Sequence, residues 1–423
     1  MEARLIKRYD SLVKSHMNNN STVSSGIKAT LNSNIAFTQT QAAWRFFNND
    51  KCGLQELVQP LIQAGKQQLS HESDEYGLVV HDWSNLGYNK HTGKKDTYNV
   101  FKACVGYHLQ TSLLISDRHG GPLAPIAMNL KSKTQLLSTY GTPSRDATNL
   151  EELIQRIKNI EAQSFEKELI HIVDREGDAV SFFRALKPYK WLIRVKGGNS
   201  VKCNGINQII SKVAAELDYT YSREVLYKGS KALQRTSETI VEITRPAKPK
   251  KNKKHLPHIP GEAVKCRLIV SKVYDQFNKE LAVWYLLSNV EDTVSAATIA
   301  LWYYWRWSIE NFFKLLKTAG LNLEQWQQET AIAIARRILV ASMACVYIWQ
   351  LAHNTRPEAA EVRKLLVRFS GRQMKWGVEF TYNALFAGLW SLLTMNDLLE
   401  QYDPQQLKEL IHNSINLIGV GVV

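Results

Sequence analysis

YGLVVHDWS, at residues 76–84, is a short apolar run that ends at an acid, Asp82. A run of about four to eight apolar residues bounded by polar ones is typical of a strand buried inside a sheet. LIHIV, at 169–173, is a second such run, and it ends at Asp174. In open α/β sheets, side chains from the ends of adjacent strands converge. Either aspartate alone is more often an ordinary residue at the start of a loop. The pair therefore indicates a functional site only if a third group lies beside it.

The sequence around these two runs alternates strand and helix patterns. A hairpin is predicted at 104–116 and 122–130, around the turn-rich DRHGG. NLEELIQRIKNIEA, at 149–162, has its apolar residues at helical spacing. A short helix at 178–186 and the strand WLIRVK at 191–196 follow. This order of elements predicts an α/β fold with an RNase H-like catalytic core.

Five regions are expected, without an internal repeat. The patterns after 196 change to short strands at 219–226, 239–244, 264–273 and 281–287, and after 293 the chain is helical. The predicted regions are helical 1–70, the first part of the core at 71–196, a β-strand insertion at 197–292, a core helix at 293–320 and a helical C-terminal region at 321–423.

The chain is strongly basic, with 53 Lys and Arg against 39 Asp and Glu, a formal net charge of +14 and a pI near 9.4. This excess favours a polyanionic partner, of which nucleic acid is the commonest, over a merely basic soluble protein. RPAKPKKNKK, at 245–254, is either a solvated flexible loop or a phosphate contact.

The five cysteines are scattered and form neither a zinc-binding pattern nor a disulfide framework, which fits a reducing cytoplasm. The N-terminus lacks the apolar core of a signal peptide. The charge-free run at 338–351 is too short to span a bilayer, so it predicts a buried helix. We expect a soluble cytoplasmic protein without a membrane partner.

TIALWYYWRWSIENFFKLLKTAG, at 298–320, supplies the third acid. On one helix, at about 100° per residue, four polar side chains share an arc of about 60° beside an apolar aromatic face. They are Tyr303, Arg306, Glu310 and Lys317. The alternative is a kink near Trp307, with Ser308 capping a second helix. An Arg–Glu pair at this spacing is usually a surface pair, and only its combination with the two strand-end acids suggests a site.

Three carboxylates suit phosphodiester chemistry, in which two divalent cations activate a hydroxyl and stabilise the leaving oxyanion. Asp82 would bridge both ions, and Asp174 and Glu310 would each complete one. Mg²⁺ prefers such oxygen ligands, and Mn²⁺ can substitute for it. The basic side chains of the helix cannot ligate a cation but can bind phosphate. Glu176 and Asp178 are competing acids; Asp174 is preferred because it directly closes the apolar run.

These residues resemble the DDE transposases of bacterial insertion sequences, in the IS-four group, whose signature is Tyr-x2-Arg-x3-Glu-x6-Lys. The signature is intact from Tyr303 to Lys317, and HDWSNLGY and VDREGDA are similar to the family's two aspartate blocks. The acids lie 92 and then 136 residues apart, which suits a strand-rich insertion before the last catalytic helix. AAWRFFNN, at 42–49, is similar to the family's end-binding helical domain.

The resemblance implies cut-and-paste transposition of double-stranded DNA. Water nicks a transposon end, the freed 3′-hydroxyl forms a hairpin, the hairpin is reopened, and the 3′-hydroxyl attacks target DNA. Residues 1–70 would bind transposon ends, and 321–423 would dimerise in a homodimeric synaptic complex in the bacterial cytoplasm, at the nucleoid. Trp284 would stack on a flipped base, although a core tryptophan is an equal alternative. Arg194 and Lys196, on one strand face, would meet DNA near the cut.

Three other classes compete with this interpretation. A catalytically silent DNA-binding derivative would have lost at least one of the three acids, and all three are present. An RNase H-like nuclease needs the acids, but its chemistry does not demand the Tyr, Arg and Lys of the helix. A helical scaffold protein explains the C-terminal third of the chain and not the acids.

Overall fold

The computed structural model describes the chain except residues 1, 18–32, 228–229, 250–256, 319–320 and 418–423. Part of the predicted N-terminal region and residues 250–254 of the basic run therefore lie outside the described residues. The chain divides into two compact units. We call Leu54–Asn89 with Asp96–Phe312 the sheet unit, and Met1–Gly53, Lys90–Lys95 and Phe313–Val423 the helical unit.

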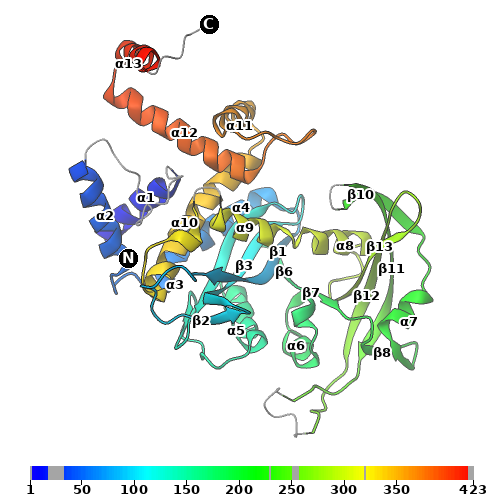
Figure 1. Ribbon diagram of the computed structural model, residues 1–423. Coiled ribbons are helices and arrows are strands. Elements are labelled where there is room, and N and C mark those ends of the chain that lie inside the picture. The colour runs from blue at the N-terminus through cyan, green and yellow to red at the C-terminus, as the bar shows by residue number, and fades with distance from the viewer. Residues whose placement is uncertain (1, 18–32, 228–229, 250–256, 319–320, 418–423) are drawn as a thin grey trace. The chain divides into compact units, whose positions relative to one another are not determined.

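The sheet unit contains one large mixed sheet, which confirms the α/β class (Figure 1). Among the described residues it has thirteen strands. They are β1 (Tyr76–Gly87), β2 (Tyr98–Phe101), β3 (Cys104–Ser116), β4 (Pro122–Lys131), β5 (Leu136–Ser138), β6 (Glu168–Val173), β7 (Lys190–Val195), β8 (Ser200–Cys203), β9 (Ile206–Ile209), β10 (Tyr221–Tyr227), β11 (Ser230–Ile243), β12 (Val264–Tyr274) and β13 (Glu280–Ser288).

The strand order is β5-β4-β3-β1-β6-β7-β13-β12-β11-β8-β9, with β2 on β3 and β10 on β11. β1 is parallel to β6 and β6 is parallel to β7, whereas the other named pairings are antiparallel. The predicted β-rich segment continues the sheet, because its last strand, β13, pairs with β7. Four strands of three or four residues, β2, β5, β8 and β9, were not predicted because such short segments show no period.

The helices of the sheet unit pack on this sheet and complete its core. They are α3 (Leu54–Leu57), α4 (Gln59–Glu72), α5 (Asn149–Glu161), α6 (Val180–Ala185), α7 (Ile210–Ala215), α8 (Ala296–Trp305) and the first half of α9 (Ser308–Lys317). α5 confirms the helix predicted at 149–162, and it begins at a capping box in which Thr148 and Glu151 bond each other's backbone N–H. Its Leu153 and Ile157 are fully buried in a core that includes Trp191 of β7.

The helical unit contains α1 (Ala3–Met17), α2 (Ser33–Phe47), the rest of α9, α10 (Ala331–His353), α11 (Pro357–Phe369), α12 (Tyr382–Gln401) and α13 (Pro404–Leu417). α10 confirms the buried helix predicted at 338–351 but is longer, with 23 residues. By length and composition alone it could cross a membrane, yet 89% of its most apolar window is buried inside the structure. A core helix passes the same test, so this is weak evidence for a membrane.

A chain of buried polar side chains links β1 to β6. Ser112 Oγ lies 2.8 Å from His81 Nδ1, His81 Nε2 lies 2.9 Å from His171 Nδ1, and His171 Nε2 lies 2.8 Å from Glu161. Burial, followed by the nearby His171 and Arg156, lowers the pKa of His81 well below its ordinary value, so this ring is neutral. In a neutral imidazole one ring nitrogen donates and the other accepts, so His81 makes one bond of each kind with Ser112 and His171. These hydrogen bonds join β1 to β6 at His81, one residue before Asp82.

We expect His108 to make the protein less stable in mild acid. Its ring packs edge-on against Trp83, with ring centroids 6.2 Å apart. Burial, then the charges of Lys131 and Arg156, lowers its pKa to about 4. At a pH below the ordinary histidine pKa of about 6.5, His108 is protonated in the unfolded chain but stays neutral in the folded chain. Stability is therefore complete above pH 6.5 and falls as the pH drops toward 4, by up to about 1.4 kcal/mol per pH unit.

Urea unfolding at pH 7 and pH 5 tests this expectation in the wild type and in His108→Gln. The free energy of unfolding should drop by roughly 1–2 kcal/mol more in the wild type over this interval. An equal drop in both proteins would show that His108 is not the group responsible.

Candidate active site

The first two acids lie side by side because of the β1–β6 register. The last parallel pair joins His81 to Val173, and Asp82 and Asp174 are the next residue on each strand. Asp82 Oδ1 accepts the N–H of Trp83 at 2.8 Å, and Asp174 Oδ1 accepts the N–H of Glu176 at 2.8 Å. The second bond holds Asp174 as the cap of a short 3₁₀ turn, Arg175–Gly177. Both carboxylates are thus oriented by backbone. Asp174 follows the end of β6, as predicted, whereas β1 continues to Gly87, so Asp82 lies inside β1 and the predicted end of that strand at Asp82 is wrong.

The predicted single helix at 298–320 is wrong, because the chain breaks it between α8 and α9. The hairpin turn of β3 and β4 meets this break at Gly120. Gly120 has φ +69°, and a Cβ there would come within 2.3 Å of the Trp305 ring. Ser308 Oγ donates to the Gly120 carbonyl at 2.8 Å, so this residue bonds the hairpin turn. The structure thus bears out the kink near Trp307 but not the cap, because Ser308 is the first residue of α9 and its hydroxyl bonds Gly120.

The break places Arg306 between two of the acids. Its guanidinium donates to Asp82 Oδ2 at 2.7 Å and to Glu310 Oε1 at 3.2 Å. The Arg306 side chain is only 13% exposed, against 20% for Asp82 and 36% for Glu310. A planar guanidinium can bind two oxygens at once, and here it bonds Glu310, four residues along the chain, and Asp82, 224 positions away in sequence. The pair with Glu310 is therefore part of a buried cluster and not a surface ion pair.

The neighbouring acids affect the pKa values of Asp82 and Glu310. Burial raises the pKa of Asp82; Arg306 opposes this rise and Asp174 adds to it. Burial likewise raises the pKa of Glu310, Arg306 again opposes the rise, and the charges of Asp82 and Asp174 add to it. Removing charge from water and bringing like charges together both favour the protonated form. A cation beside these carboxylates is consequently stabilising, and Arg306 supplies one.

The donor chemistry of this cluster suits a hard divalent cation. Asp82, Asp174 and Glu310 offer carboxylate oxygens, the ligands that Mg²⁺ and Mn²⁺ prefer. In the part of the chain that the structure describes, no three His, Cys, Asp or Glu side chains already form a metal-binding group. Arg306 instead occupies the space between two of them, as a stand-in for a cation. An ion would bind after a shift of these side chains.

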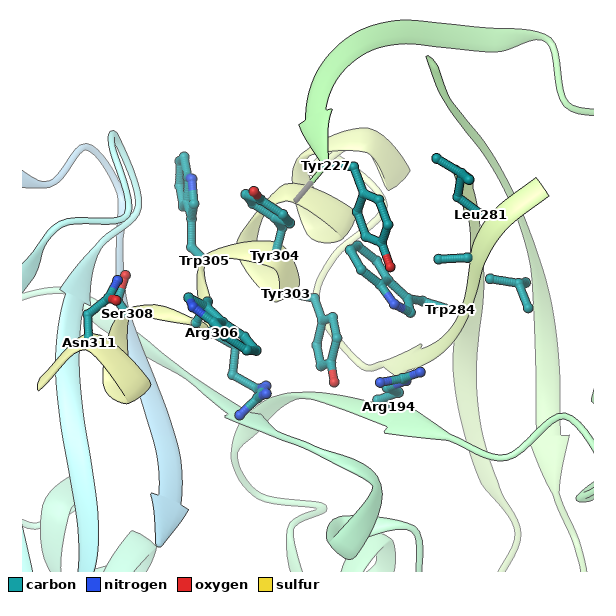
Figure 2. A pocket seen from close by; sticks show the side chains of 13 residues that line it. Arg194, Tyr227, Leu281, Trp284, Tyr303, Tyr304, Trp305, Arg306, Ser308 and Asn311 are labelled. Atoms are coloured by element: carbon teal, nitrogen blue, oxygen red, sulfur yellow. The ribbon is translucent and has the colours of Figure 1, made fainter. Parts of the chain in front are cut away.

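An aromatic cavity lies beside Arg306, the residue that bonds Asp82 and Glu310 (Figure 2). Its volume is about 790 Å³, and Arg194, Trp284, Tyr303, Tyr304 and Arg306 are among its lining residues. The ring centroids of Trp284 lie 5.8 Å from Tyr303 and 6.3 Å from Tyr304. The Tyr303 hydroxyl points toward Arg194. Trp284 is therefore a half-buried cavity wall and not a core tryptophan.

Tyr227 is a cavity residue that the sequence did not reveal. It ends β10, and Figure 2 shows its ring beside Trp284. A strand-end tyrosine carries no distinguishing pattern, and only the fold brings it to this wall.

Lys196 and Lys317, the remaining predicted residues, make contacts with other parts of the chain. Lys196 follows β7, is exposed, and donates its backbone N–H to Asp178 at 2.9 Å. Asp178 also accepts bonds from Asn199 and Arg245, which makes it a structural acid. Lys317 lies in the last turn of α9, within the helical unit, 3.2 Å from Glu324.

Glu176 remains close to the site as the competing acid. Burial raises its pKa, the negative charges of Asp174 and Asp82 add to that rise, and Trp83 opposes it. It thus belongs to the same patch of negative charge, although it is exposed and lies beyond the strand end.

Clustered carboxylates that can hold divalent cations are typical of enzymes that act on phosphodiesters. Residues 126–349, just over half of the 423 residues, match the family described as Transposase DDE domain. The match includes Asp174 and Glu310 and begins after Asp82. The chain belongs to this family, and the protein is a DDE transposase. Its family generally uses divalent metal ions.

Among solved structures, the chain is similar to a piggyBac transposase synaptic complex with hairpin DNA, at 11% identity and a TM-score of 0.39, covering 100% of this chain and 77% of that chain. It also matches Argonaute from Kluyveromyces polysporus with a guide RNA, at 9% identity and a TM-score of 0.18, covering 76% of this chain and 34% of that chain. No curated protein matches the chain significantly.

Proposed function

We propose that this DDE transposase is a cut-and-paste enzyme of the IS-four group, and that it acts through a DNA hairpin. The observation that carries the proposal is the joining of Asp82 and Glu310 by Arg306, with Asp174 at the adjacent strand end. The order β4-β3-β1-β6-β7 supports an RNase H-like core, with residues 197–292 as its β-strand insertion.

We assign Asp82, Asp174 and Glu310 as the ligands of two divalent cations, Mg²⁺ with Mn²⁺ as substitute. When bound, such ions supply an activated hydroxyl and offset the charge of the leaving oxygen. Arg306 then exchanges its carboxylate partners for a phosphate oxygen, which a guanidinium can bind in the same two-pronged way.

The side chains around Arg306 hold the DNA strand. Tyr303 donates its hydroxyl to a phosphate, and Arg194 beside it supplies positive charge at the same place. Lys196, exposed at the end of β7, and Lys317 on α9 contact phosphates farther along the backbone. None of these contacts reads base sequence, so their role is to set the position of the strand.

The cavity provides a place for a base that has left the helix. A sharp hairpin cannot form while its terminal bases remain stacked, so one base must turn out and bind elsewhere. The cavity volume of about 790 Å³ lies within the usual range for small-ligand sites. Trp284 offers a ring face on which the base stacks, and Tyr227 closes the same wall.

Trp284→Ala should separate nicking from hairpin formation. The substrate is a duplex that carries the inverted repeat flanking this gene, incubated with Mg²⁺ and resolved on denaturing gels. First-strand nicking should stay within about twofold of the wild type, because the acids are unchanged. Hairpin yield should fall about tenfold or more, because the variant loses one base–aromatic stacking interaction.

Two further variants control this test. Trp284→Phe keeps a ring and should recover most of the hairpin yield. Phe277→Ala removes an 80% exposed aromatic ring from the turn between β12 and β13 and should change neither step. Equal loss of both steps in Trp284→Ala would refute base binding by Trp284, and nicking without any hairpin in the wild type would identify a nuclease.

The assembly around this site follows from the same proposal. Residues 1–70 bind transposon ends, residues 321–423 support a homodimer in the synaptic complex, and the enzyme acts on end and target DNA in the bacterial cytoplasm. The regions 71–196 and 293–320 form the two parts of the catalytic core.

A further inference from the structure

The segment between α11 and α12 (Figure 1) contains an exposed tryptophan, Trp376. Trp376 is 101% exposed, more than the other large apolar side chains of the described residues. The Val378 N–H donates to the Lys375 carbonyl at 3.0 Å, and Gly377 has φ +76°. A four-residue turn of this kind needs a positive φ at its third residue, which glycine supplies without strain. The backbone thus holds the indole away from the protein.

Basic side chains surround this turn. Residues 362–378 contain five Lys and Arg and no acid. Arg368, Arg372 and Lys375 are all exposed. The next acid, Glu379, lies 3.8 Å from Arg363 and is thereby partly neutralised. Arg368, Arg372, Lys375 and Trp376 therefore form a basic, exposed stretch of sequence that carries one aromatic ring.

We propose that this stretch, the Trp376 patch, binds unpaired DNA in the helical unit, apart from the acids. Three cations favour a polyanion, and an indole open on both faces suits a base without a stacking partner. A duplex hides the faces of its bases, whereas a single strand offers them in turn. The proposal rests on the protein's membership of a DNA transposase family and not on the hairpin pathway.

Fluorescence anisotropy with the full chain, in EDTA, tests the proposal without catalysis. The probes are labelled (dT)20 and a mixed-sequence 20-base-pair duplex. Trp376→Ala should weaken binding of (dT)20 about tenfold and leave duplex binding within about twofold, because one base stack is lost. Trp376→Phe should stay within about threefold of the wild type. Because the side chain touches little of the protein, neither variant should unfold it.

The charge of the patch has its own measurement. Arg372→Ala with Lys375→Ala should lower the slope of log affinity against log salt for (dT)20 by about 1.4, the value for two phosphates. Phe277→Ala serves as the control for loss of an exposed ring. Unchanged (dT)20 binding in Trp376→Ala, or equal loss on both probes, would overturn the proposal. So would a change from dimer to monomer in light scattering, which would make the patch a protein interface.

Discussion

Asp82→Asn is expected to abolish strand cleavage, by about a thousandfold or more, while DNA binding stays within about twofold. The amide keeps the size of the carboxylate and loses the charge that holds a cation, and several kcal/mol of catalysis depend on that charge. Asp82 is the strongest choice because it accepts the 2.7 Å bond from Arg306 and is the less exposed of the two bridged acids. Nicking of labelled end duplex at saturating Mg²⁺ gives the measurement.

A matched variant decides between the neighbouring acids. Glu176→Gln removes a charge from the same patch and should keep cleavage within about threefold, since Asp174 is the assigned ligand. Thermal unfolding gives a readout independent of activity, because an ion that binds only the folded state raises Tm. Mn²⁺ should raise the Tm of the wild type and of Glu176→Gln but not that of Asp82→Asn. Normal cleavage by Asp82→Asn would show the assignment to be wrong.

Arg267→Met is expected to cost about 3 kcal/mol or more of the free energy of unfolding. The Arg267 side chain is 6% exposed and pairs with Glu238 at 2.6 Å. It also donates to the carbonyls of Val290 and Glu291, and to that of Val294 at 2.8 Å. Methionine fills similar volume but leaves these acceptors unpaired, and breaking a buried ion network on one side is strongly destabilising. Tm should fall by roughly 10 °C.

The bonds of Arg267 fix the segment that leads into α8, so the same variant should slow cleavage. Lys265→Met, two residues earlier on β12 and exposed, is the control and should change stability by less than about 0.5 kcal/mol. Similar Tm values for the two variants would show that Arg267 does not anchor this segment.

The sequence predicted those parts of the fold whose signal is local. The strands that carry Asp82 and Asp174 are continuous apolar runs, and α5 has both an apolar stripe and a cap. The break between α8 and α9 was harder to predict, because TIALWYYWRWSIENFF contains neither proline nor glycine. The break depends on Gly120, in a hairpin turn almost 190 residues earlier. The helix propensities of the residues in this segment do not depend on that contact, so they cannot predict the break.

The same limit explains the site. Spacing along one helix predicted that Arg306 and Glu310 would pair, and they do. Nothing local indicated that Arg306 also holds Asp82, or that Tyr227 joins the cavity wall. No sequence pattern distinguishes Trp376, because the property that marks it is the complete exposure of its side chain. Long-range pairing and exposure are properties of the folded chain alone.

The pairing of β13 with β7 bears on the stage of synthesis at which the active site can assemble. Roughly 90 residues separate these partners, and pairings over such distances form late because the intervening loop must first lose its entropy. Glu310 follows β13, so a ribosome-bound chain that already contains Asp82 and Asp174 still lacks the third acid. The order of the elements thus delays assembly of the cluster until the β-rich segment has docked, and an unfinished chain is spared the capacity to cut DNA.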